Sequence, residues 1–336
     1  VCNSYNFMAK RAPLIFGTLY KKTNKDNFFS DLVPRLFSFL SMLLKKAIET
    51  TQPDVIITTH PFATEMISAL KSRYNYNLKL VCVITDYGLH RAWIGDGVDS
   101  YVVACEDMIP SMTARGVSPD KIHSFGIPVY SRFFEDLDRE YFMDEIGLDS
   151  NLPTVLLMAG SMGVSHIITL YQMLAEINTH IQIMIITGKN RKLYDAFESE
   201  ISKGTKHPTH LVYFTDKVEN YMKSADIIIT KPGGLTTSEA IACNLPIAAF
   251  DAIPGQEEDN AEFIVSNNMG IRVSPSTGFA EKIEALISDD ERLYEMQNNC
   301  MKFDKSECCR NIVDLIENIN GAVNVRSVLE KNVYDQ

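Results

Sequence analysis

The chain has 336 residues, of which 46% are hydrophobic and 22% charged, a composition typical of a folded protein with two domains rather than one. The longest mainly apolar run that we find, Leu36–Leu44, has nine residues, two of them serines, whereas a membrane-spanning helix needs about twenty. A net charge of −11 argues against a protein that binds nucleic acid with its whole surface. Seven cysteines without a CxxC pair indicate free thiols in a reducing, cytoplasmic compartment.

Residues 1–50 differ in charge from the rest of the chain. They hold eight basic and three acidic residues, a balance of +5, so the remainder of the net −11 is −16. Residues 35–49 predict a helix with a broad apolar face that ends in Lys45 and Lys46. Such a helix can lie in the interface of an anionic membrane or pack on its own domain, and its spacing alone leaves both open.

From residue 53 onward, short β-branched runs alternate with amphipathic helical stretches, which is typical of doubly wound parallel sheets. A first series of strands is predicted at residues 54–59, 79–85, 100–104 and 123–125. A second series is predicted at residues 154–159, 182–187, 211–214, 226–230, 246–250 and 270–273. A polar, acidic bridge at 134–153 places the domain boundary near residue 148. We therefore predict an α/β protein with domains at 1–148 and 149–310 and a tail at 311–336.

The segment DIIITKPGGLTTSEA, residues 226–240, predicts a buried strand, a turn at 231–234 and a helix that starts at Thr236 or Thr237. The first N–H groups of a helix lack intrahelical acceptors and carry the positive end of its dipole, so this arrangement predicts a phosphate site. Glu239 falls near the start of the helix, where its carboxylate can accept hydrogen bonds from vicinal hydroxyls such as those of a ribose. An ordinary tight turn with threonine caps explains the same residues without a ligand.

Two further motifs follow strands of the second series. Gly160-Ser161-Met162-Gly163 opens a helix, and two glycine turns at the carboxyl ends of one sheet are what a nucleotide crevice at a topological switch point needs. Neither turn is GxGxxG or GxxxxGK[ST], which disfavours dinucleotide and P-loop sites. Gln256 and Asn260 lie four residues apart at the start of a predicted helix, so their amides either read sugar hydroxyls or form a polar helix terminus.

Polar residues also follow strands of the first domain. His60 comes after the first predicted strand, and Asp86 and His90 come after the second. Such residues face a crevice at the carboxyl edge of the sheet and can serve as a general base, although a capping role explains them without chemistry. No GxSxG, HExxH or CxxC motif is present, which disfavours hydrolases and zinc enzymes.

Four blocks taken together resemble a known family. They are VITDYGLHRAWIGDGVDSYVVA at 83–104, FGIPVYSRF at 125–133, TKPGGLTTSEA at 230–240 and LPIAAFDAIPGQEEDNAEF at 245–263. Their order and spacing resemble the processive diacylglycerol glucosyltransferases and monogalactosyldiacylglycerol synthases of glycosyltransferase family 28. The resemblance implies a GT-B fold, which is two Rossmann-like domains with a cleft between them, and inverting transfer of a hexose to diacylglycerol from UDP-glucose, which is favoured, or UDP-galactose.

The resemblance also implies the partners of the protein. The UDP-sugar is a co-substrate, and neither a further cofactor nor a metal is expected. Diacylglycerol and an anionic membrane surface are the other partners, while nucleic acid is not one. The N-terminal domain would face the membrane, and the protein would be peripheral on the inner face of the cell membrane.

The resemblance assigns roles to residues that match the family's motifs. The two glycine turns would hold the donor diphosphate through Gly160, Ser161, Gly163, Lys231, Gly233, Gly234 and Thr236. Glu239 would hold the ribose, and the backbone near Val218 would meet the uracil. Gln256 and Asn260 would bind hydroxyls of the hexose.

The chain departs from the family at its start. Family members open with a strand and a glycine-rich loop ending in a histidine that contributes to acceptor activation, and this chain has neither. We therefore expect an incomplete first domain without its first strand, and Asp86 and His90 stand as the catalytic candidates. Two alternatives remain: the related N-acetylglucosaminyltransferase of the lipid-linked peptidoglycan precursor, and a catalytically inactive UDP-sugar sensor.

Overall fold

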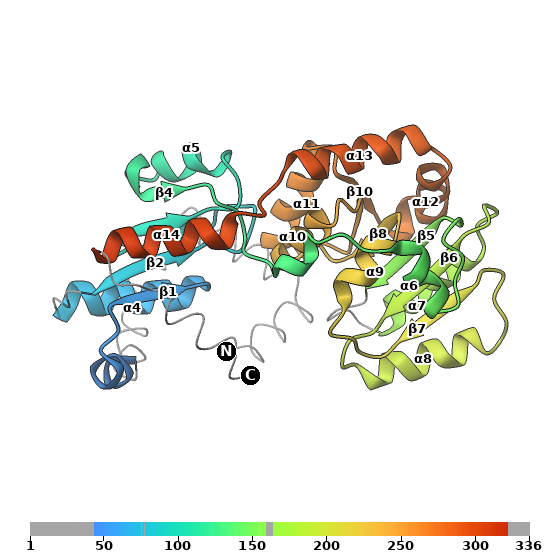
Figure 1. The fold of residues 1–336 in the computed structure, drawn as a ribbon, viewed down its shortest axis with the longest axis horizontal. Coiled ribbons are helices and arrows are strands. Elements are labelled where there is room, and N and C mark those ends of the chain that lie inside the picture. Colours follow the sequence, from blue (N-terminus) through green and yellow to red (C-terminus); the bar gives the residue numbers. More distant parts are fainter. Residues whose placement is uncertain (1–43, 75, 77, 159–163, 322–336) are drawn as a thin grey trace. The chain divides into compact units, whose positions relative to one another are not determined.

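The computed structural model describes residues 44–74, 76, 78–158 and 164–321, and its ribbon is drawn in Figure 1. The chain divides into two compact units. The first unit takes the residues up to Pro128, the short segment Ile253–Gln256 and the residues from Lys305 onward. The second unit takes Val129–Ala252 and Glu257–Asp304. Each unit is built around its own parallel sheet.

The sheet of the first unit has the strand order β1-β2-β3-β4. Its strands are β1 (Val55–Thr58), β2 (Lys79–Val83), β3 (Ser100–Val102) and β4 (Ile122–His123). All neighbouring pairs are parallel, with Thr58 opposite Cys82 and Val83 opposite Val102. The first series of predicted strands is therefore confirmed to within a few residues, because a run of β-branched side chains is long enough for a strand and too short for a buried helix.

Two helices cover the two faces of this sheet. Cys82 points toward α4 (Pro61–Tyr74), where its sulfur lies 3.4 Å from the Thr64 hydroxyl. Side chains alternate along a strand, and the neighbouring Val81 and Val83 pack with Cys308, Ile312 and Ile316 of α14 (Cys308–Asn320). Among its described residues the unit also contains α5 (Met108–Thr113), η1 (Arg91–Trp93), η2 (Pro119–Lys121) and the helical residues 44–51.

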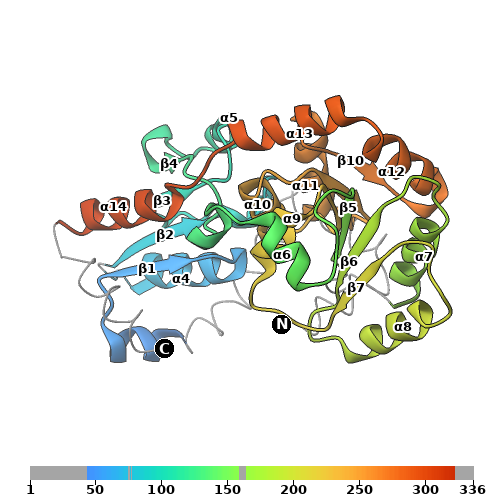
Figure 2. The same ribbon diagram turned by 45° about the vertical axis from the view of Figure 1, so that its right-hand side comes forward.

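The sheet of the second unit has the order β10-β9-β8-β5-β6-β7. Its strands are β5 (Thr154–Met158), β6 (Gln182–Ile186), β7 (Thr209–Val212), β8 (Ile227–Thr230), β9 (Ile247–Phe250) and β10 (Gly270–Val273), and Figure 2 shows β5, β6 and β7 side by side. The second predicted series is thus confirmed. The order places β5 and β8 at the point where the winding reverses, with Met158 opposite Thr230.

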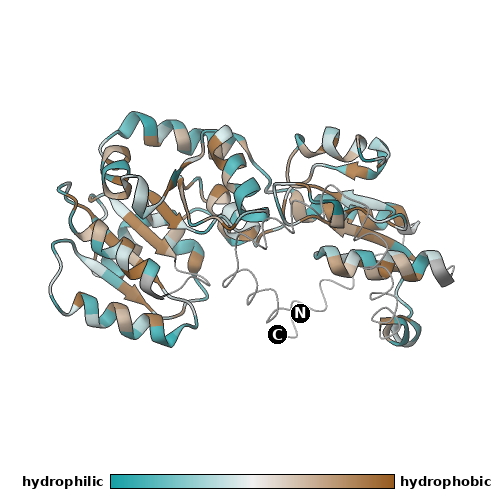
Figure 3. Ribbon diagram, turned by 180° about the vertical axis from the view of Figure 1, so that it is seen from behind, coloured by the Kyte–Doolittle hydropathy of each residue, from teal (hydrophilic) through white to brown (hydrophobic). Residues whose placement is uncertain are grey.

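Helices cover the second sheet. They are α6 (Arg139–Glu145), α7 (Val164–Ala175), α8 (Arg191–Ile201), α9 (Val218–Ser224), α10 (Gly234–Ala242), α11 (Gln256–Ser266), α12 (Phe279–Ile287) and α13 (Asp290–Lys302), with short 3₁₀ turns η3 (Ser131–Phe133) and η4 (Pro275–Thr277). Apolar residues of α7, α8, α12 and α13 form one buried cluster with the strands. Figure 3 shows the strands coloured as hydrophobic and much of the helix surface as hydrophilic, the expected pattern of a sheet buried on both faces.

The predicted domain limits differ from the division that the structure shows. The first unit ends its initial stretch at Pro128 rather than near residue 148. The reason is that α6, which lies in the predicted bridge, packs on α9 of the second unit. Arg139 of α6 donates to Asp226 Oδ2 at 3.1 Å, and the same oxygen accepts from the backbone N–H of Thr154. The predicted tail at 311–336 is corrected for residues 311–320, because they belong to α14, which is part of the core of the first unit.

The predicted helix at 35–49 is described in part. Residues 44–51 are helical, with Ile48 buried, and residues 1–43 lie outside the described residues, as do 322–336. Within the described ranges, no helix has the length and apolar character that crossing a membrane requires.

Candidate functional site

A glycine turn joins β8 to α10 in the second unit. The N–H of Gly233 donates to the Lys231 carbonyl at 2.8 Å, and Thr237 N closes the first helical bond onto the Gly233 carbonyl. The helix begins at Gly234, two or three residues before the predicted start at Thr236 or Thr237, and Gly233 caps it without a side-chain hydrogen bond. The N–H groups of the first turn therefore have no side-chain cap at this end, which is the arrangement of an anion site.

The turn is open on one side and held on the other. A Cβ built on Gly233 would meet nothing within 4 Å, so there is room beside the backbone for a ligand. Asn260 of α11 lies beneath the turn, where its Nδ2 donates to the Pro232 carbonyl at 2.9 Å. Asn260 is 0% exposed, so this arrangement does not favour its predicted contact with a hexose. The structure instead shows Asn260 fixing the turn.

The residues of the first turn of α10 point in different directions. Thr237 is buried, and among the described residues its Oγ1 has no hydrogen-bond partner. Thr236 is half-buried, and Leu235 is 53% exposed. The predicted contact of Thr236 with a diphosphate stays a prediction, and Leu235 adds an apolar side chain that the sequence pattern did not single out.

Glu239 lies on α10 one turn beyond Leu235 and is half-buried. Burial raises the pKa of its carboxyl to about 7, with a further rise from Glu219 and an opposing effect of Arg132. Arg132 is itself paired with Glu219, with Nε and Oε2 3.2 Å apart. Hydrogen bonds from hydroxyl groups stabilise the charged form of such a desolvated carboxyl more than that of an exposed one, because they offset the cost of burying the charge. The ribose role of Glu239 stays a prediction.

A chain of charged side chains runs across the carboxyl ends of β8 and β9. Lys231 Nζ lies 3.9 Å from Asp251 Oδ2 and 3.6 Å from Glu257 Oε2. His166 Nδ1, on α7, lies 4.0 Å from the same Oδ2 of Asp251. Asp251 and His166 were not among the predicted site residues. The signal in the sequence was the position of Asp251 directly after a buried strand, the same signal that singled out Asp86.

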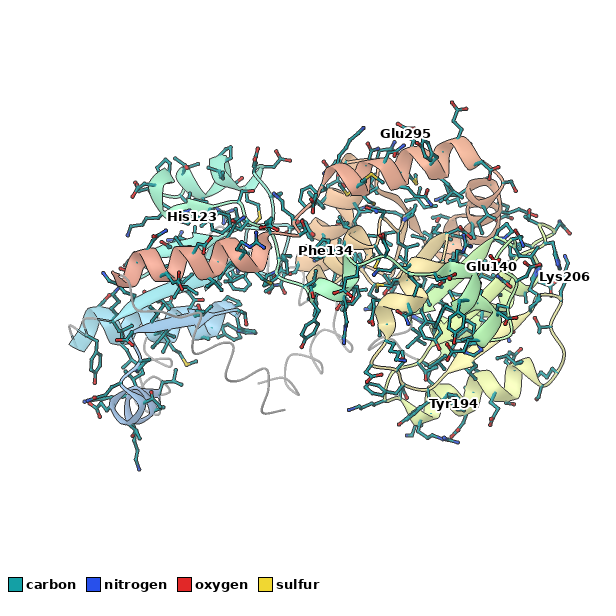
Figure 4. The ribbon with its side chains drawn as sticks, viewed as in Figure 1. His123, Phe134, Glu140, Tyr194, Lys206 and Glu295 are labelled. Carbon is teal, nitrogen blue, oxygen red and sulfur yellow. The ribbon has the colours of Figure 1, made fainter. Side chains whose placement is uncertain are left out.

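The end of the sheet beyond β6 and β7 carries aromatic and cationic side chains. Lys189 lies over the Phe214 ring at 4.7 Å, and Arg191 lies over the rings of Tyr194 and Tyr213. Figure 4 shows Tyr194 projecting from α8. Val218, predicted to lie near the uracil, is the first residue of α9 and follows this group in sequence. Flat rings of this kind suit a nucleobase, and the uracil contact stays a prediction.

The catalytic candidates Asp86 and His90 lie in the first unit, after β2. His90 is 8% exposed, and its Nδ1 accepts from the Ala92 N at 3.1 Å as the cap of η1. A neutral ring that accepts at Nδ1 carries its proton on Nε2, which suits a donor rather than a base. Asp86 is 9% exposed, and its Oδ2 accepts from Gln256 Nε2 at 2.8 Å. The structure therefore brings together Asp86, which was predicted as a catalytic candidate, and Gln256, which was predicted to bind the hexose.

The other predicted glycine turn, with Gly160, Ser161 and Gly163, lies outside the described residues. The strand before it is described: Met158 at the end of β5 pairs with Thr230 at the end of β8, so β5 and β8 are adjacent strands. This is the juxtaposition expected at a topological switch point.

Comparison with known protein families covers most of the chain. Residues 1–129 match the family described as monogalactosyldiacylglycerol (MGDG) synthase. Residues 154–312 match the C-terminal domain of glycosyltransferase family 28.

Known relatives decide the assignment. A processive diacylglycerol beta-glucosyltransferase of Staphylococcus carnosus is 31% identical over 288 residues, which is 84% of this chain and 71% of that protein. The chain belongs to glycosyltransferase family 28. A family 28 relative from Bacillus subtilis, also a processive diacylglycerol beta-glucosyltransferase, is 28% identical over 76% of this chain and 66% of its own. The resemblance seen in the sequence blocks is thereby confirmed, and the protein is a glycosyltransferase.

Solved structures share the fold of this family 28 chain. MurG of Acinetobacter baumannii matches with a TM-score of 0.61 at 14% identity, covering 85% of this chain and 79% of that one. Anabaena HepE in complex with UDP-glucose matches with a TM-score of 0.55 at 14% identity over 82% of each chain. A UDP-GlcNAc 2-epimerase of Neisseria meningitidis reaches 0.63 at 15% identity, covering 88% and 83%. The predicted GT-B fold with two Rossmann-like sheets is confirmed.

Proposed function

We propose that this family 28 glycosyltransferase moves a hexose from a UDP-sugar, UDP-glucose in preference to UDP-galactose, to diacylglycerol with inversion at the anomeric carbon. The observation that carries the donor half is the uncapped start of α10 after β8, with Lys231 before it and Glu239 within it. The acceptor half is supported by the diacylglycerol named in the Staphylococcus and Bacillus relatives.

The leaving group is stabilised by the second unit. As the bond between the anomeric carbon and the diphosphate oxygen breaks, negative charge grows on the UDP oxygens. The N–H groups at the start of α10 and the Lys231 ammonium can receive this charge without a bound metal. Asn260 contributes indirectly, because its bond to the Pro232 carbonyl keeps the turn in place.

The acceptor is activated by the first unit. A diacylglycerol hydroxyl attacks the anomeric carbon, and its proton must pass to a base. Asp86 fits this role better than His90, whose Nδ1 is occupied by the Ala92 N–H. Gln256 Nε2 donates to Asp86 Oδ2 at 2.8 Å, and a carboxylate held by such a bond can take the proton of an acceptor hydroxyl that comes within hydrogen-bond distance.

The full chain tests this proposal with radiolabelled UDP-glucose or UDP-galactose and vesicles that contain diacylglycerol. We expect one UDP released for each hexose that enters a lipid, resolved by thin-layer chromatography. Tight UDP binding without transfer to any lipid would indicate a sensor. Transfer of N-acetylglucosamine to the lipid-linked peptidoglycan precursor, but not of hexose to diacylglycerol, would assign the chain to the alternative enzyme.

We further propose that the protein attaches peripherally to the inner face of the cell membrane through its basic N-terminal part. Replacing Lys21, Lys22, Lys45 and Lys46 by glutamine should weaken binding to anionic vesicles, since each cation near the surface contributes about 1 kcal/mol. Co-sedimentation at two salt concentrations measures the effect.

The control for this experiment makes the same charge change on exposed lysines of the second unit, namely Lys192, Lys203, Lys282 and Lys302. These substitutions should leave vesicle binding unchanged. Binding that is insensitive to salt and to the four N-terminal substitutions would show that the basic segment is only a solvated surface.

A further inference from the structure

Two distances between the charged side chains at the carboxyl ends of β8 and β9 are close to 4 Å. Asp251 Oδ2 lies 4.0 Å from His166 Nδ1 and 3.9 Å from Lys231 Nζ. Both distances are too long for direct hydrogen bonds. A ligand oxygen placed about 2.8 Å from Asp251 Oδ2 and about 2.8 Å from the nitrogen of His166 or Lys231 would bridge the two atoms, with an angle of about 90° at that oxygen. Each pair is therefore spaced for one bridging hydroxyl group that donates to the carboxylate.

The exposure of these side chains shows that the gaps open outward. The Lys231 side chain is 15% exposed, while those of Asp251 and His166 are 48% and 68% exposed. Asp251 is also held in a left-handed backbone conformation with φ of 49°, which costs energy in a residue other than glycine. The backbone after β9 therefore presents this carboxylate at an accessible edge of the sheet.

The charges of the group select the kind of ligand. Asp251 and Glu257 place two carboxylates around Lys231, which disfavours a second phosphate at this point and suits neutral hydroxyl groups. Thr230 and Ala249 are paired in the sheet, so the chain after β9 leaves next to the turn after β8. A sugar attached to a diphosphate at the start of α10 would reach this neighbouring edge.

We propose that Asp251, with His166 beside it, binds hydroxyls of the transferred hexose and sets which UDP-hexose the enzyme accepts. This inference rests on the proposed function. Lys231 then serves the diphosphate on one side and orients Asp251 on the other. Because hexose epimers differ only in the direction of single hydroxyls, two fixed partners at one hydroxyl distinguish them.

Binding constants of the full chain for UDP, UDP-glucose and UDP-galactose test this inference by calorimetry. Asp251→Asn keeps the size of the side chain and removes its charge. We expect it to weaken the better-bound UDP-hexose by about fivefold or more, the loss of one hydrogen bond. The affinity for UDP alone should stay the same or increase, because a negative charge near the diphosphate is gone. His166→Ala should shift the hexose affinities in the same direction by less.

The matched control is Glu262→Gln, which removes the same charge from an exposed residue of α11 that pairs with Arg272. It should change none of the constants. Equal losses for UDP and UDP-hexose in Asp251→Asn would overturn the inference, since Asp251 would then act on Lys231 and the diphosphate. Unchanged constants would overturn it as well, with the gaps holding water only. A wild-type chain that binds no UDP would refute the proposed function itself.

Discussion

Replacement of Glu239 by alanine is expected to weaken UDP binding by about 1–3 kcal/mol, or roughly fivefold to 150-fold. The reason is that the half-buried carboxylate on α10 is the proposed partner of the ribose hydroxyls, and its loss leaves them without an acceptor in a desolvated place. Calorimetry with UDP measures the change. Glu262→Ala removes a carboxylate from the exposed pair with Arg272 in the same unit and should leave the affinity unchanged.

The same residue predicts how UDP binding depends on pH. Its pKa in the unbound protein is raised to about 7, chiefly by burial, whereas hydroxyl donors favour the charged form and lower the pKa in the complex. Binding therefore releases a proton below pH 7, and the affinity falls as the pH falls from 8 to 6. Each unit below the unbound pKa costs at most a factor of ten.

Glu239→Gln is the control for this dependence, since UDP titrates too. The variant should bind more weakly and keep only the pH dependence that belongs to the phosphate groups of UDP. The raised pKa also means that ionised Glu239 destabilises the unbound unit. The variant should therefore gain stability relative to the wild type as the pH rises from the ordinary glutamate pKa of 4.5 to about 7, with no further gain above that. A wild-type and a variant with identical pH profiles would remove Glu239 from the ribose site.

Gly270→Ala is expected to destabilise the second unit by about 3 kcal/mol or more, because the added methyl has nowhere to go. A Cβ at Gly270 would lie 1.9 Å from the Ile247 carbonyl oxygen and 2.8 Å from Cγ2 of Ile264. The obstacle is backbone of the adjacent strand β9, which cannot shift without breaking the ladder. Urea unfolding followed by far-ultraviolet circular dichroism measures the loss.

Gly233→Ala separates this packing effect from ligand binding. Gly233 has an ordinary φ of −71°, and a Cβ there meets nothing within 4 Å. We expect this variant to unfold like the wild type but to bind UDP more weakly, because the methyl enters the space next to the turn. A loss of stability in Gly233→Ala equal to that in Gly270→Ala would contradict the expectation that the space beside Gly233 is open.

Much of this architecture could be predicted from local pattern. Each predicted strand is present because a buried parallel strand needs only a short β-branched run and a turn. The site after β8 could also be predicted from the sequence, since the strand, the glycine turn and the helix start are contiguous at 226–240. The predicted helix start was two or three residues too late, because Gly233 caps α10 with its backbone.

The parts that the sequence did not predict depend on distant partners. Gln256 and Asp86 are 170 residues apart and share one hydrogen bond. The spacing of Asn260 with Gln256 predicts a sugar ligand, and it gave no sign of the hydrogen bond that its Nδ2 donates to the Pro232 carbonyl. Likewise, most of α14 falls in the stretch predicted as a tail at 311–336, and nothing in its sequence indicates which sheet it covers. Periodicity identifies an apolar face without identifying the surface that receives it.

The path of the chain between the units has a consequence for biosynthesis. The first unit contains the earliest strands, yet the helix α14 that covers Val81 and Val83 comes from residues beyond Lys305. On the ribosome, the second unit has all of its segments once Asp304 has emerged. The first sheet keeps one apolar face uncovered until α14 follows, and exposed faces of this kind are what chaperones bind. The unit that is translated first is therefore completed last.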